Sequence, residues 1–400
     1  MECSSPTLKG WLKDCTFALS TGNIMKIAIL ADPLDNQRGG VHVYTRELIT
    51  ALVQLDSNNE YLLVREKATP AIPGTQSLVV PNNRFGLVFA AFRMFFIVPF
   101  LLRRHQVDVV LEPAHFGPFN LPRRIHRVTV IHDLTPLLFP QYHIWHSQML
   151  QRLFLKGILK RASLVITNSR HTRKDVLQHF PFLKNKVIAA HLGANPALGP
   201  TADRSWLDQK EIRQPYWLTV GTIEPRKNLV NLLKSYQQYR DNGGGGQLVI
   251  AGQRGWKAEP FFEALGQHSY RTDIHLTGFV PDEALPQLYS HAKALIYPSE
   301  YEGFGLPVLE AMRCGCPVIC SSVSSLPEVG GPLAYYVDYQ HPASIARQIQ
   351  AVDRLDESAR SALREKSVAW AGQFTWAAHA EACRAAIQKL DTKQPESRHV

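Results

Sequence analysis

The chain has 400 residues, of which 45% are hydrophobic, and a formal net charge of +10. This length exceeds one ordinary compact domain, so two packed cores are expected. Six scattered cysteines exclude a disulfide framework in a chain this long and favour a reducing compartment. The positive charge favours anionic partners, but it does not distinguish nucleic acid, phosphorylated small molecules and an acidic membrane surface.

Residues 1–24 are predicted to form a loosely ordered extension, because they mix charged residues with short apolar pieces and lack the apolar core of a signal peptide. The most apolar stretch, residues 87–102, is interrupted by Arg93 and Pro99 and is shorter than the roughly 20 residues that a membrane-spanning helix needs. The sequence therefore predicts a soluble or peripheral protein in the cytoplasm, with the inner face of the cytoplasmic membrane as the alternative location.

Short buried strands separated by helical or loop segments recur through residues 25–199. A strand is expected at KIAIL from Lys26, followed by a polar loop with Gly39 and Gly40 and by a helix over residues 42–55. Further strand candidates are YLLV at 61, DVVL at 108, VTVI at 128, LVIT at 164 and VIAA at 187. This alternation predicts an α/β domain with a parallel sheet.

The polar stretch at residues 200–215 is typical of a linker. A second alternation follows over residues 216–375, and residues 376–400 are expected to form a C-terminal helix and tail. Strand candidates in this half are YWLTV at 216, QLVIA at 247, DIHL at 273, ALIYP at 294, PVICS at 317 and AYYV at 334. Two doubly wound, Rossmann-like domains facing each other across a cleft are therefore expected, with ligands beyond the carboxyl ends of the strands.

The loop GTIEPRKNL, residues 221–229, follows the strand YWLTV and precedes a helix. Gly221 permits a tight exit from the strand. Arg226 and Lys227 place two cations near a helix N-terminus, whose free amides also favour an anion. This combination suits a diphosphate, although the loop alone leaves open a solvated cation pair on a surface turn.

The segment PSEYEGFGLPVLEAMRCGCPV begins at Pro298, after the strand ALIY. Gly303 and Gly305 let backbone amides approach a ligand closely, and a helix is expected directly after them. Glu302 precedes the glycines and Glu310 lies about one turn into the helix, so the two carboxylates are too far apart for an acid–base dyad. They suit two diols of one long ligand, Glu310 on a ribose and Glu302 on a transferred sugar. A loop acid and a first-turn helix acid are the plain alternatives.

Together these two loops resemble glycosyltransferase family 4, a group of retaining enzymes with the GT-B fold, and in particular its bacterial mannosyltransferase-like members. The resemblance covers nearly the whole chain after residue 25. It is also carried by GGVHVYTREL at 39, IHDLTPLLFP at 131, TNSRHTRKDV at 167, SSVSSLPEVGG at 321 and FTWAAHAEAC at 374. It implies transfer of a hexose, with mannose favoured, from a nucleotide diphosphate-sugar to a saccharide or lipid-linked acceptor in cell-envelope polysaccharide synthesis.

The two loops and the resemblance also predict site residues. The expected donor contacts are Gly39, Gly40, Gly221, Arg226, Lys227, Glu302, Gly303, Phe304, Gly305, Leu306 and Glu310. The expected catalytic residues are His132, Asp133, Arg226, Lys227 and Glu302. The resemblance places His132 beside the donor sugar through its backbone or its imidazole, and makes Asp133 an orienting or acceptor-contacting group. A histidine at a strand end is otherwise often structural.

The resemblance implies front-side substitution, in which the leaving diphosphate helps to deprotonate the incoming hydroxyl. The donor is a substrate, with GDP-mannose favoured, and neither a cofactor nor a metal is expected. Cys314, Cys316 and Cys320 lack the further ligands of a zinc site, which favours small core residues.

Several alternatives remain open at this point. A nucleotide-sugar epimerase or a phosphorylase on the same fold would keep the phosphate loop, and an inactive scaffold would bind nucleotide sugar without turnover. No recognisable nucleic-acid module is present, so no nucleic-acid partner is expected. Residues 84–105 and 142–162 mix aromatic, aliphatic and basic side chains, which suits either peripheral contact with an anionic membrane or core helices with basic ends.

Overall fold

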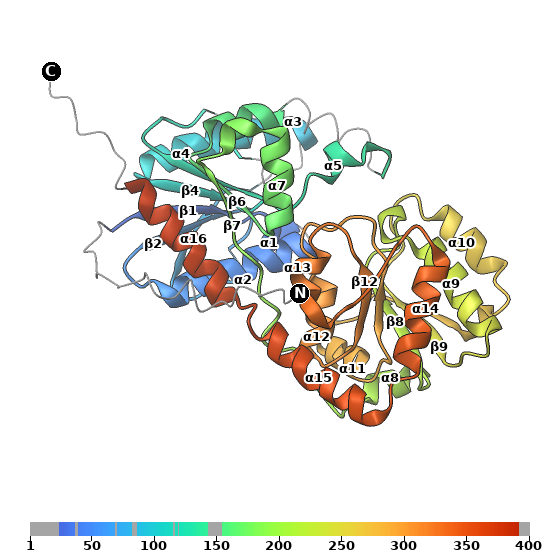
Figure 1. Ribbon diagram of the computed structural model, residues 1–400. Helices are drawn as coiled ribbons and strands as arrows, with labels where there is room; N and C mark the ends of the chain where they lie inside the picture. The colour runs from blue at the N-terminus through green and yellow to red at the C-terminus, as the bar shows by residue number, and fades with distance from the viewer. Residues whose placement is uncertain are drawn as a thin grey trace, which may run out of the picture.

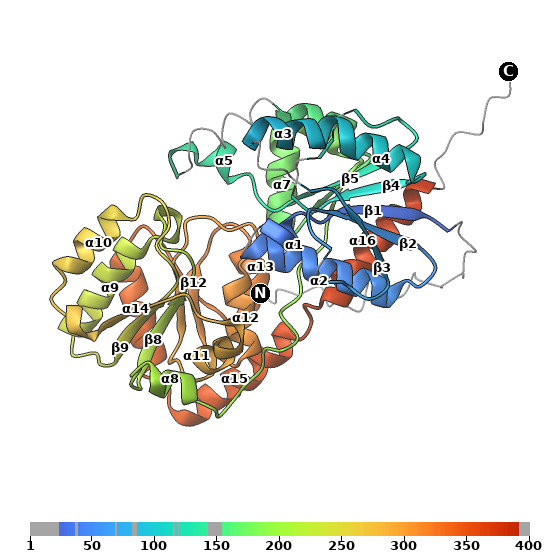
Figure 2. The ribbon, with the colours of Figure 1, turned by 180° about the vertical axis from the view of Figure 1, so that it is seen from behind.

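A computed structural model of the chain describes residues 24–36, 39–68, 70–81, 86–114, 117–118, 120–142 and 154–391. It has two lobes side by side, each built around one parallel sheet with helices on both faces (Figures 1 and 2). This arrangement confirms the predicted α/β fold of two Rossmann-like domains. The predicted N-terminal extension, apart from Ile24, lies outside the described residues.

The N-terminal sheet has seven parallel strands in the order β3-β2-β1-β4-β5-β6-β7. They are β1 (Lys26–Leu30), β2 (Glu60–Arg65), β3 (Thr75–Val79), β4 (Val109–Glu112), β5 (His126–Ile131), β6 (Leu164–Thr167) and β7 (Val187–Ala189). Each strand candidate of this half is confirmed. The prediction missed β3, an edge strand of sequence TQSLV whose side chains are exposed or half-buried, so it has no apolar run.

The C-terminal sheet has six parallel strands in the order β10-β9-β8-β11-β12-β13. They are β8 (Tyr216–Val220), β9 (Gln247–Ala251), β10 (Ile274–Gly278), β11 (Leu295–Tyr297), β12 (Val318–Ser321) and β13 (Tyr335–Val337). All six were predicted. In this doubly wound order the direction of winding reverses between β8 and β11, and ligands bind at the carboxyl ends of the strands at such a switch point.

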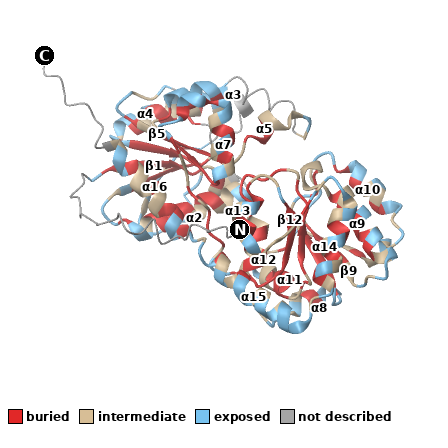
Figure 3. Ribbon diagram, in the orientation of Figure 1, coloured by how far each residue is buried: buried red, intermediate tan, exposed pale blue. Residues whose placement is uncertain are grey.

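Helices pack on both faces of each sheet, and the strands form the buried centre of each lobe (Figure 3). The described helical segments of the N-terminal lobe are α1 (Pro33–Asn36), α2 (Gly40–Leu55), α3 (Gly86–Phe92), the π-helix η2 (Arg93–Ile97), α4 (Val98–Arg104), α5 (Thr135–Leu138), η3 (Pro140–Tyr142), residues 154–161, α7 (Arg170–His179) and η4 (Pro181–Leu183). Those of the C-terminal lobe are α8 (Ser205–Gln209), η5 (Pro225–Lys227), α9 (Leu229–Asp241), α10 (Glu259–Gly266), η6 (Arg271–Asp273), η7 (Asp282–Ala284), α11 (Leu285–Ser290), α12 (Leu306–Arg313), α13 (Leu326–Gly330), η8 (Gly331–Leu333), α14 (Pro342–Asp353) and α15 (Glu357–Ala371). None of the helices in these described ranges is long and apolar enough to cross a membrane.

The segment expected to be a linker, residues 200–215, is more structured than its polar composition indicates. It contains the short helix α8, which packs near α11, and it buries Leu207 and Ile212 in the main core. The amide of Trp206 also donates to the side chain of Gln287 at 2.8 Å. These contacts attach the segment to the C-terminal lobe.

The last described helix, α16 (Trp376–Asp391), returns to the N-terminal lobe and lies along α2 (Figure 1). Trp376, Ala380, Cys383 and Ile387 form one buried face of α16 at helical spacing. The chain therefore passes between the lobes twice, and the two passages touch, since the amide of Ala194 donates to the carbonyl of Phe374 at 3.3 Å.

Candidate active site

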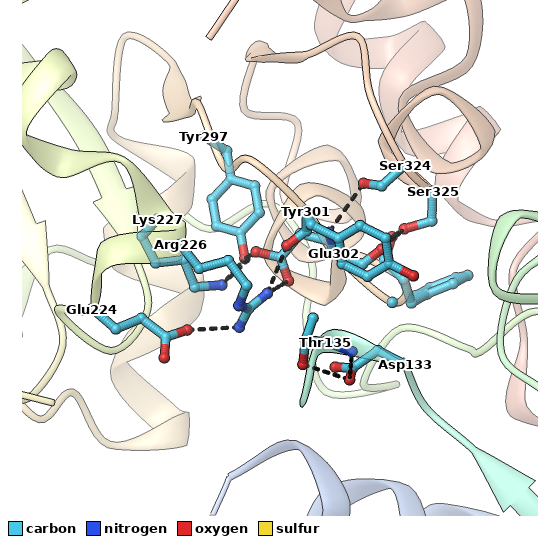
Figure 4. Close-up of polar contacts among 12 residues, drawn as sticks. Asp133, Thr135, Glu224, Arg226, Lys227, Tyr297, Tyr301, Glu302, Ser324 and Ser325 are labelled. Carbon is cyan, nitrogen blue, oxygen red and sulfur yellow. Dashed lines mark hydrogen bonds and ion pairs between the residues drawn. The ribbon is translucent and has the colours of Figure 1, made fainter. Parts of the chain in front are cut away.

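Three loops meet between the lobes at the carboxyl ends of their strands. The loop after β8 carries Arg226 and Lys227 on η5, the loop after β11 carries Glu302, and the loop after β5 carries His132 and Asp133. Figure 4 shows the side chain of Asp133 on the side of Glu302 and Arg226 that faces the N-terminal lobe. The two loops of the C-terminal lobe follow β8 and β11, the two strands that flank the switch point.

The carboxylate of Glu302 is the centre of this site. Lys227 Nζ lies 2.7 Å from Glu302 Oε1, and Arg226 Nη1 lies 2.8 Å from Glu302 Oε2. Glu302 itself is buried. One acid is thus held by both of the cations that the sequence assigns to a diphosphate.

Two further side chains join this cluster, and sequence reasoning did not identify either. The buried carboxylate of Glu224 accepts from Arg226 Nη2 at 2.6 Å. The hydroxyl of Tyr297 accepts from Lys227 Nζ and donates to Glu302 Oε1 at 3.0 Å. Glu224 lies two residues before Arg226, and Tyr297 is the last residue of β11. Their positions, in the same loop and at the end of the strand, were the only sequence features that could have indicated these two residues.

The expected cationic pocket is therefore a charge-compensated cluster of two cations and two carboxylates. Burial opposes ionisation of Glu302, but Arg226 and Lys227 outweigh it and lower the pKa of this carboxyl to about 2. Burial acts to lower the pKa of Arg226, but Glu302 and Glu224 raise it overall. Burial lowers the pKa of Lys227, although Glu302 favours its charged form. Glu302 thus remains an anion, and so a hydrogen-bond acceptor, throughout the physiological range.

Glu310 lies apart from this cluster, in the second turn of α12. Its Oε2 accepts from the hydroxyl of Tyr289 on α11 at 2.9 Å. Burial raises the pKa of Glu310 to about 7, and this effect outweighs the Tyr289 hydrogen bond, which acts in the opposite direction. The two glutamates therefore have different partners and opposite pKa shifts, which suits contacts with two different parts of a ligand.

Three of the predicted glycines have geometric reasons to be glycine. Gly221 has φ +140°, and a Cβ there would lie 3.3 Å from Cε of Lys227. Gly305 has φ +99° and caps α12, where a Cβ would lie 2.7 Å from Leu326. A Cβ on Gly303 would lie 2.1 Å from the carbonyl oxygen of His132. Gly303 is thus a point at which the backbones of the two lobes approach closely.

Phe304 and Leu306 are the remaining predicted residues of this loop and of the helix that follows it. Phe304 is buried, with its ring centroid 6.1 Å from that of His191 and 6.2 Å from that of Phe374, so its side chain serves packing and only its backbone is available to a donor. Leu306 is the first residue of α12 and is half-buried.

On the N-terminal side, His132 and Asp133 have different orientations. The imidazole of His132 directs Nε2 to the carbonyl of Pro113 at 2.7 Å and packs edge-on against the ring of Tyr44, with 4.7 Å between centroids. Burial lowers the pKa of His132. The backbone carbonyl of His132 faces the C-terminal loop at Gly303. Asp133 Oδ1 accepts from the amide and the hydroxyl of Thr135 at 2.9 and 2.7 Å, which fixes its carboxylate.

Gly39 and Gly40 lie at the start of α2. Gly39 has φ +98° and caps the helix without a side-chain hydrogen bond, and both glycines are exposed. Residues 37–38 lie outside the described residues. Within the described part of the chain, no hydrogen bond or ion pair joins Gly39 or Gly40 to the Glu302 cluster.

The cysteines that could suggest a metal, Cys314, Cys316 and Cys320, are buried free thiols. Burial raises the pKa of each thiol to about 12. Among the residues that the structure describes, no three His, Cys, Asp or Glu side chains gather as a metal site would require.

Two family profiles match the chain, Glycosyltransferase Family 4 over residues 38–198 and Glycosyl transferases group 1 over residues 205–368. The chain is similar to O-antigen chain mannosyltransferase B from Escherichia coli, with 31% identity over 375 residues, covering 88% of this chain and 96% of the relative.

Solved structures resemble the chain at lower identity. Sucrose-phosphate synthase from Thermosynechococcus elongatus superposes with a TM-score of 0.74 and 20% identity, covering 92% of this chain and 100% of that one. Anabaena Alr3699/HepE in complex with UDP-glucose gives a TM-score of 0.71 and 17% identity, covering 91% and 100%. At these identities the two structures bear on the fold alone.

Proposed function

This chain belongs to glycosyltransferase family 4, and on that premise we propose that it is a retaining mannosyltransferase that uses GDP-mannose. The observation that carries the proposal is the Glu302 carboxylate held by Lys227 and Arg226 at the switch point of the C-terminal sheet, opposite Asp133. The E. coli relative is named for mannosyl transfer to O-antigen chains, and it matches this chain over almost its full length. The proposed acceptor is a saccharide or lipid-linked saccharide of a cell-envelope polysaccharide such as a lipopolysaccharide O-chain, at the cytoplasmic side of the membrane.

In the proposed reaction the bond between the sugar C1 and the diphosphate oxygen breaks, and a bond from C1 to the acceptor oxygen forms on the same face. The acceptor proton moves to the departing diphosphate. Arg226, Lys227 and the first amides of α12 would stabilise the negative charge that develops on the leaving group. These cations would supply the charge that a divalent ion supplies in metal-dependent transferases.

Glu302 and Glu310 would recognise the two polyols of the donor. Glu302, whose pKa is lowered to about 2 and which is therefore ionised near neutral pH, would accept hydrogen bonds from hydroxyls of the transferred sugar. Glu310 would accept hydrogen bonds from the ribose diol. Backbone amides of residues 303–306 would meet the phosphate and sugar, and Asp133 would orient the acceptor.

The donor class is tested by a thermal-shift panel of nucleoside diphosphates and nucleotide sugars. A ligand that binds only the folded state raises the melting temperature, so GDP and GDP-mannose are expected to stabilise the protein more than their UDP or ADP counterparts. Product analysis with GDP-mannose then separates transfer from epimerisation, which needs no acceptor. Stabilisation by no nucleotide would contradict the proposal.

The same titration should depend on pH through Glu310. The affinity for GDP-mannose is expected to fall by roughly tenfold between about pH 8 and about pH 6, because a carboxyl with a pKa of about 7 is mostly protonated at the lower pH and then accepts the ribose hydroxyls poorly. Glu310→Gln should bind weakly without this pH dependence. Tyr289→Phe removes a hydrogen bond that favours the ionised form and should move the transition to higher pH. A pH dependence that persists in Glu310→Gln would exclude this role.

We also propose that the protein contacts an anionic membrane through the end of α3, η2 and α4, which follow one another without a break. Phe92, Phe96 and Phe100 are 49%, 61% and 61% exposed at a spacing of four residues, while Val98 and Leu102 on the opposite face are buried. The sequence is compatible with a core helix or an interfacial helix, and this helical segment has both a buried face and an exposed aromatic face. Of residues 142–162, those at 143–153 lie outside the described residues.

The distribution of charge supports this proposal. Residues 25–199 contain 21 Lys and Arg against 10 Asp and Glu, whereas residues 200–400 contain 21 against 22. The exposed Arg103 and Arg104 lie in the last turn of α4, three and four residues after Phe100. Exposed aromatic side chains with adjacent basic residues are typical of helices that lie in the interface of an anionic membrane.

Co-sedimentation with phosphatidylcholine vesicles, with and without phosphatidylglycerol, tests this contact. The wild type is expected to sediment with the anionic vesicles, less so at high salt, and the double variant Phe96→Ser, Phe100→Ser should lose most binding. Phe279→Ser in the C-terminal lobe, where Phe279 is 66% exposed, is the matched control and should bind like the wild type. Equal binding by the double variant would contradict the proposed surface.

A further inference from the structure

Two sequence motifs have no part in the function described so far, TNSRHT at 167–172 and SSLPEVGG at 324–331. In the structure they meet across the boundary between the lobes, at the first turn of α7. Ser169 Oγ donates to the carbonyl of Gly303 at 2.7 Å, and Thr172 Oγ1 donates to the same carbonyl at 3.1 Å. Both hydroxyl-bearing residues are fully buried.

Two other groups of the C-terminal lobe contact the same turns of α7. The carboxylate of Glu328 accepts from the amides of Arg170 and His171 at 2.9 and 2.7 Å, and it lies 2.8 Å from His191 Nε2. The hydroxyl of Tyr301 donates to Asp175 Oδ2 at 2.6 Å. Residues on both sides of Glu302 are therefore attached to one helix of the opposite lobe.

The Gly303 carbonyl belongs to the peptide unit between Gly303 and Phe304, one unit beyond the Glu302–Gly303 peptide. Fixing it restricts the loop backbone on the C-terminal side of Glu302. The C-terminal lobe holds the backbone of Glu302 itself. The amide of Glu302 donates to Ser324 Oγ at 3.0 Å, and its carbonyl accepts from Ser325 Oγ at 2.9 Å. The carbonyl oxygen of His132 also lies 2.1 Å from the position that a Cβ on Gly303 would take, so the backbone of Gly303 packs closely against His132. Hydroxyls of the C-terminal lobe thus hold the backbone of Glu302, and hydroxyls of the N-terminal lobe hold the next residue, Gly303.

We infer that Ser169 and Thr172 are positioning residues, which hold the Gly303 carbonyl and thereby direct the Glu302 carboxylate at the donor sugar when the lobes are together. Glu328 and Asp175 keep α7 against the C-terminal lobe. This inference rests on the proposed function of Glu302. Recognition of the sugar would then depend on the N-terminal lobe, whereas residues of the C-terminal lobe would bind the nucleoside diphosphate.

Thr172→Val tests the inference, because it removes the hydroxyl and keeps the shape of the side chain. Ser169 is less suitable because its Oγ also accepts from the amide of Thr172 and caps α7. With GDP-mannose, kcat is expected to fall roughly three- to tenfold, which is the effect of one neutral hydrogen bond. The Kd for GDP, measured by calorimetry, should stay within about twofold of the wild type. Thr172→Ser keeps the hydroxyl and should restore kcat.

Thr45→Val is the matched control, since Thr45 is also fully buried and its hydroxyl donates to one backbone carbonyl, that of Val41 within α2. It should lower the melting temperature as Thr172→Val does and leave kcat unchanged. If Thr172→Val folds poorly, Tyr301→Phe, which removes the hydrogen bond to Asp175, should show the same separation of kcat from GDP affinity.

Three outcomes would overturn the inference while the proposed function stands. Thr172→Val could keep the wild-type kcat, Thr172→Ser could lose as much kcat as Thr172→Val, or Thr172→Val could lose affinity for GDP in parallel with kcat. A wild-type protein that neither binds nor turns over any nucleotide sugar would overturn the proposed function, and the inference with it.

Discussion

Replacing Glu302 by Gln is expected to lower the turnover of GDP-mannose by about 10²- to 10³-fold, the loss typical of removing one well-placed polar group from a transition-state site. Gln keeps the size of the side chain and removes the charge that Lys227 and Arg226 hold at 2.7 and 2.8 Å. Because the two cations lose their anionic partner, the affinity for GDP should stay the same or increase. Steady-state kinetics and calorimetric titration with GDP measure the two effects separately.

Glu300→Gln is the control for this variant. Glu300 lies two residues earlier in the same loop, and its carboxylate accepts from the hydroxyl of Tyr142 at 2.6 Å, outside the Glu302 cluster. It should retain most of the turnover. Comparable losses in both variants would indicate that the loop tolerates no change of charge, and would remove the specific role of Glu302.

Replacing Arg226 by Leu is expected to lower the free energy of unfolding by about 3 to 5 kcal/mol near neutral pH, the cost typical of removing one partner from a buried ion pair. Arg226 bridges Glu302 and Glu224, whose side chains are 9% and 3% exposed, so its loss leaves two buried carboxylates with fewer partners. Urea unfolding measures this change. Arg204→Leu removes an exposed pair with Asp208 and should cost less than about 1 kcal/mol.

The cost of losing Arg226 should also depend on pH. Because the pKa of Glu302 is lowered in the folded protein, its ion pairs stabilise the fold fully above the usual pKa of 4.5, and this contribution disappears as the pH falls through about 2. The difference between Arg226→Leu and the wild type should therefore shrink in acid. A difference that stays constant from neutral pH to about pH 3 would indicate that Arg226 stabilises the fold through packing rather than through charge.

The sheets could be predicted because a parallel strand buried on both faces appears as a continuous apolar run, as KIAIL and YWLTV do. The edge strand β3 lacks such a run. The loops after β8 and β11 could be predicted because glycines, cations and acids stand directly after strands. No local pattern predicts that Glu302 binds Lys227 from 75 residues away, or that the imidazole of His132 turns to Pro113. Both contacts depend on how separate loops meet.

The contact of α16 with α2 has a consequence for the order in which the protein folds. The ring of Tyr44 is covered by Trp376 and His379, and its hydroxyl lies 3.1 Å from His379 Nε2, a separation of 335 residues along the chain. During synthesis the intervening lobe can fold as a unit before α16 has left the ribosome. Until then the part of α2 that α16 covers, including Tyr44, stays uncovered, so the lobe that is translated first is completed last.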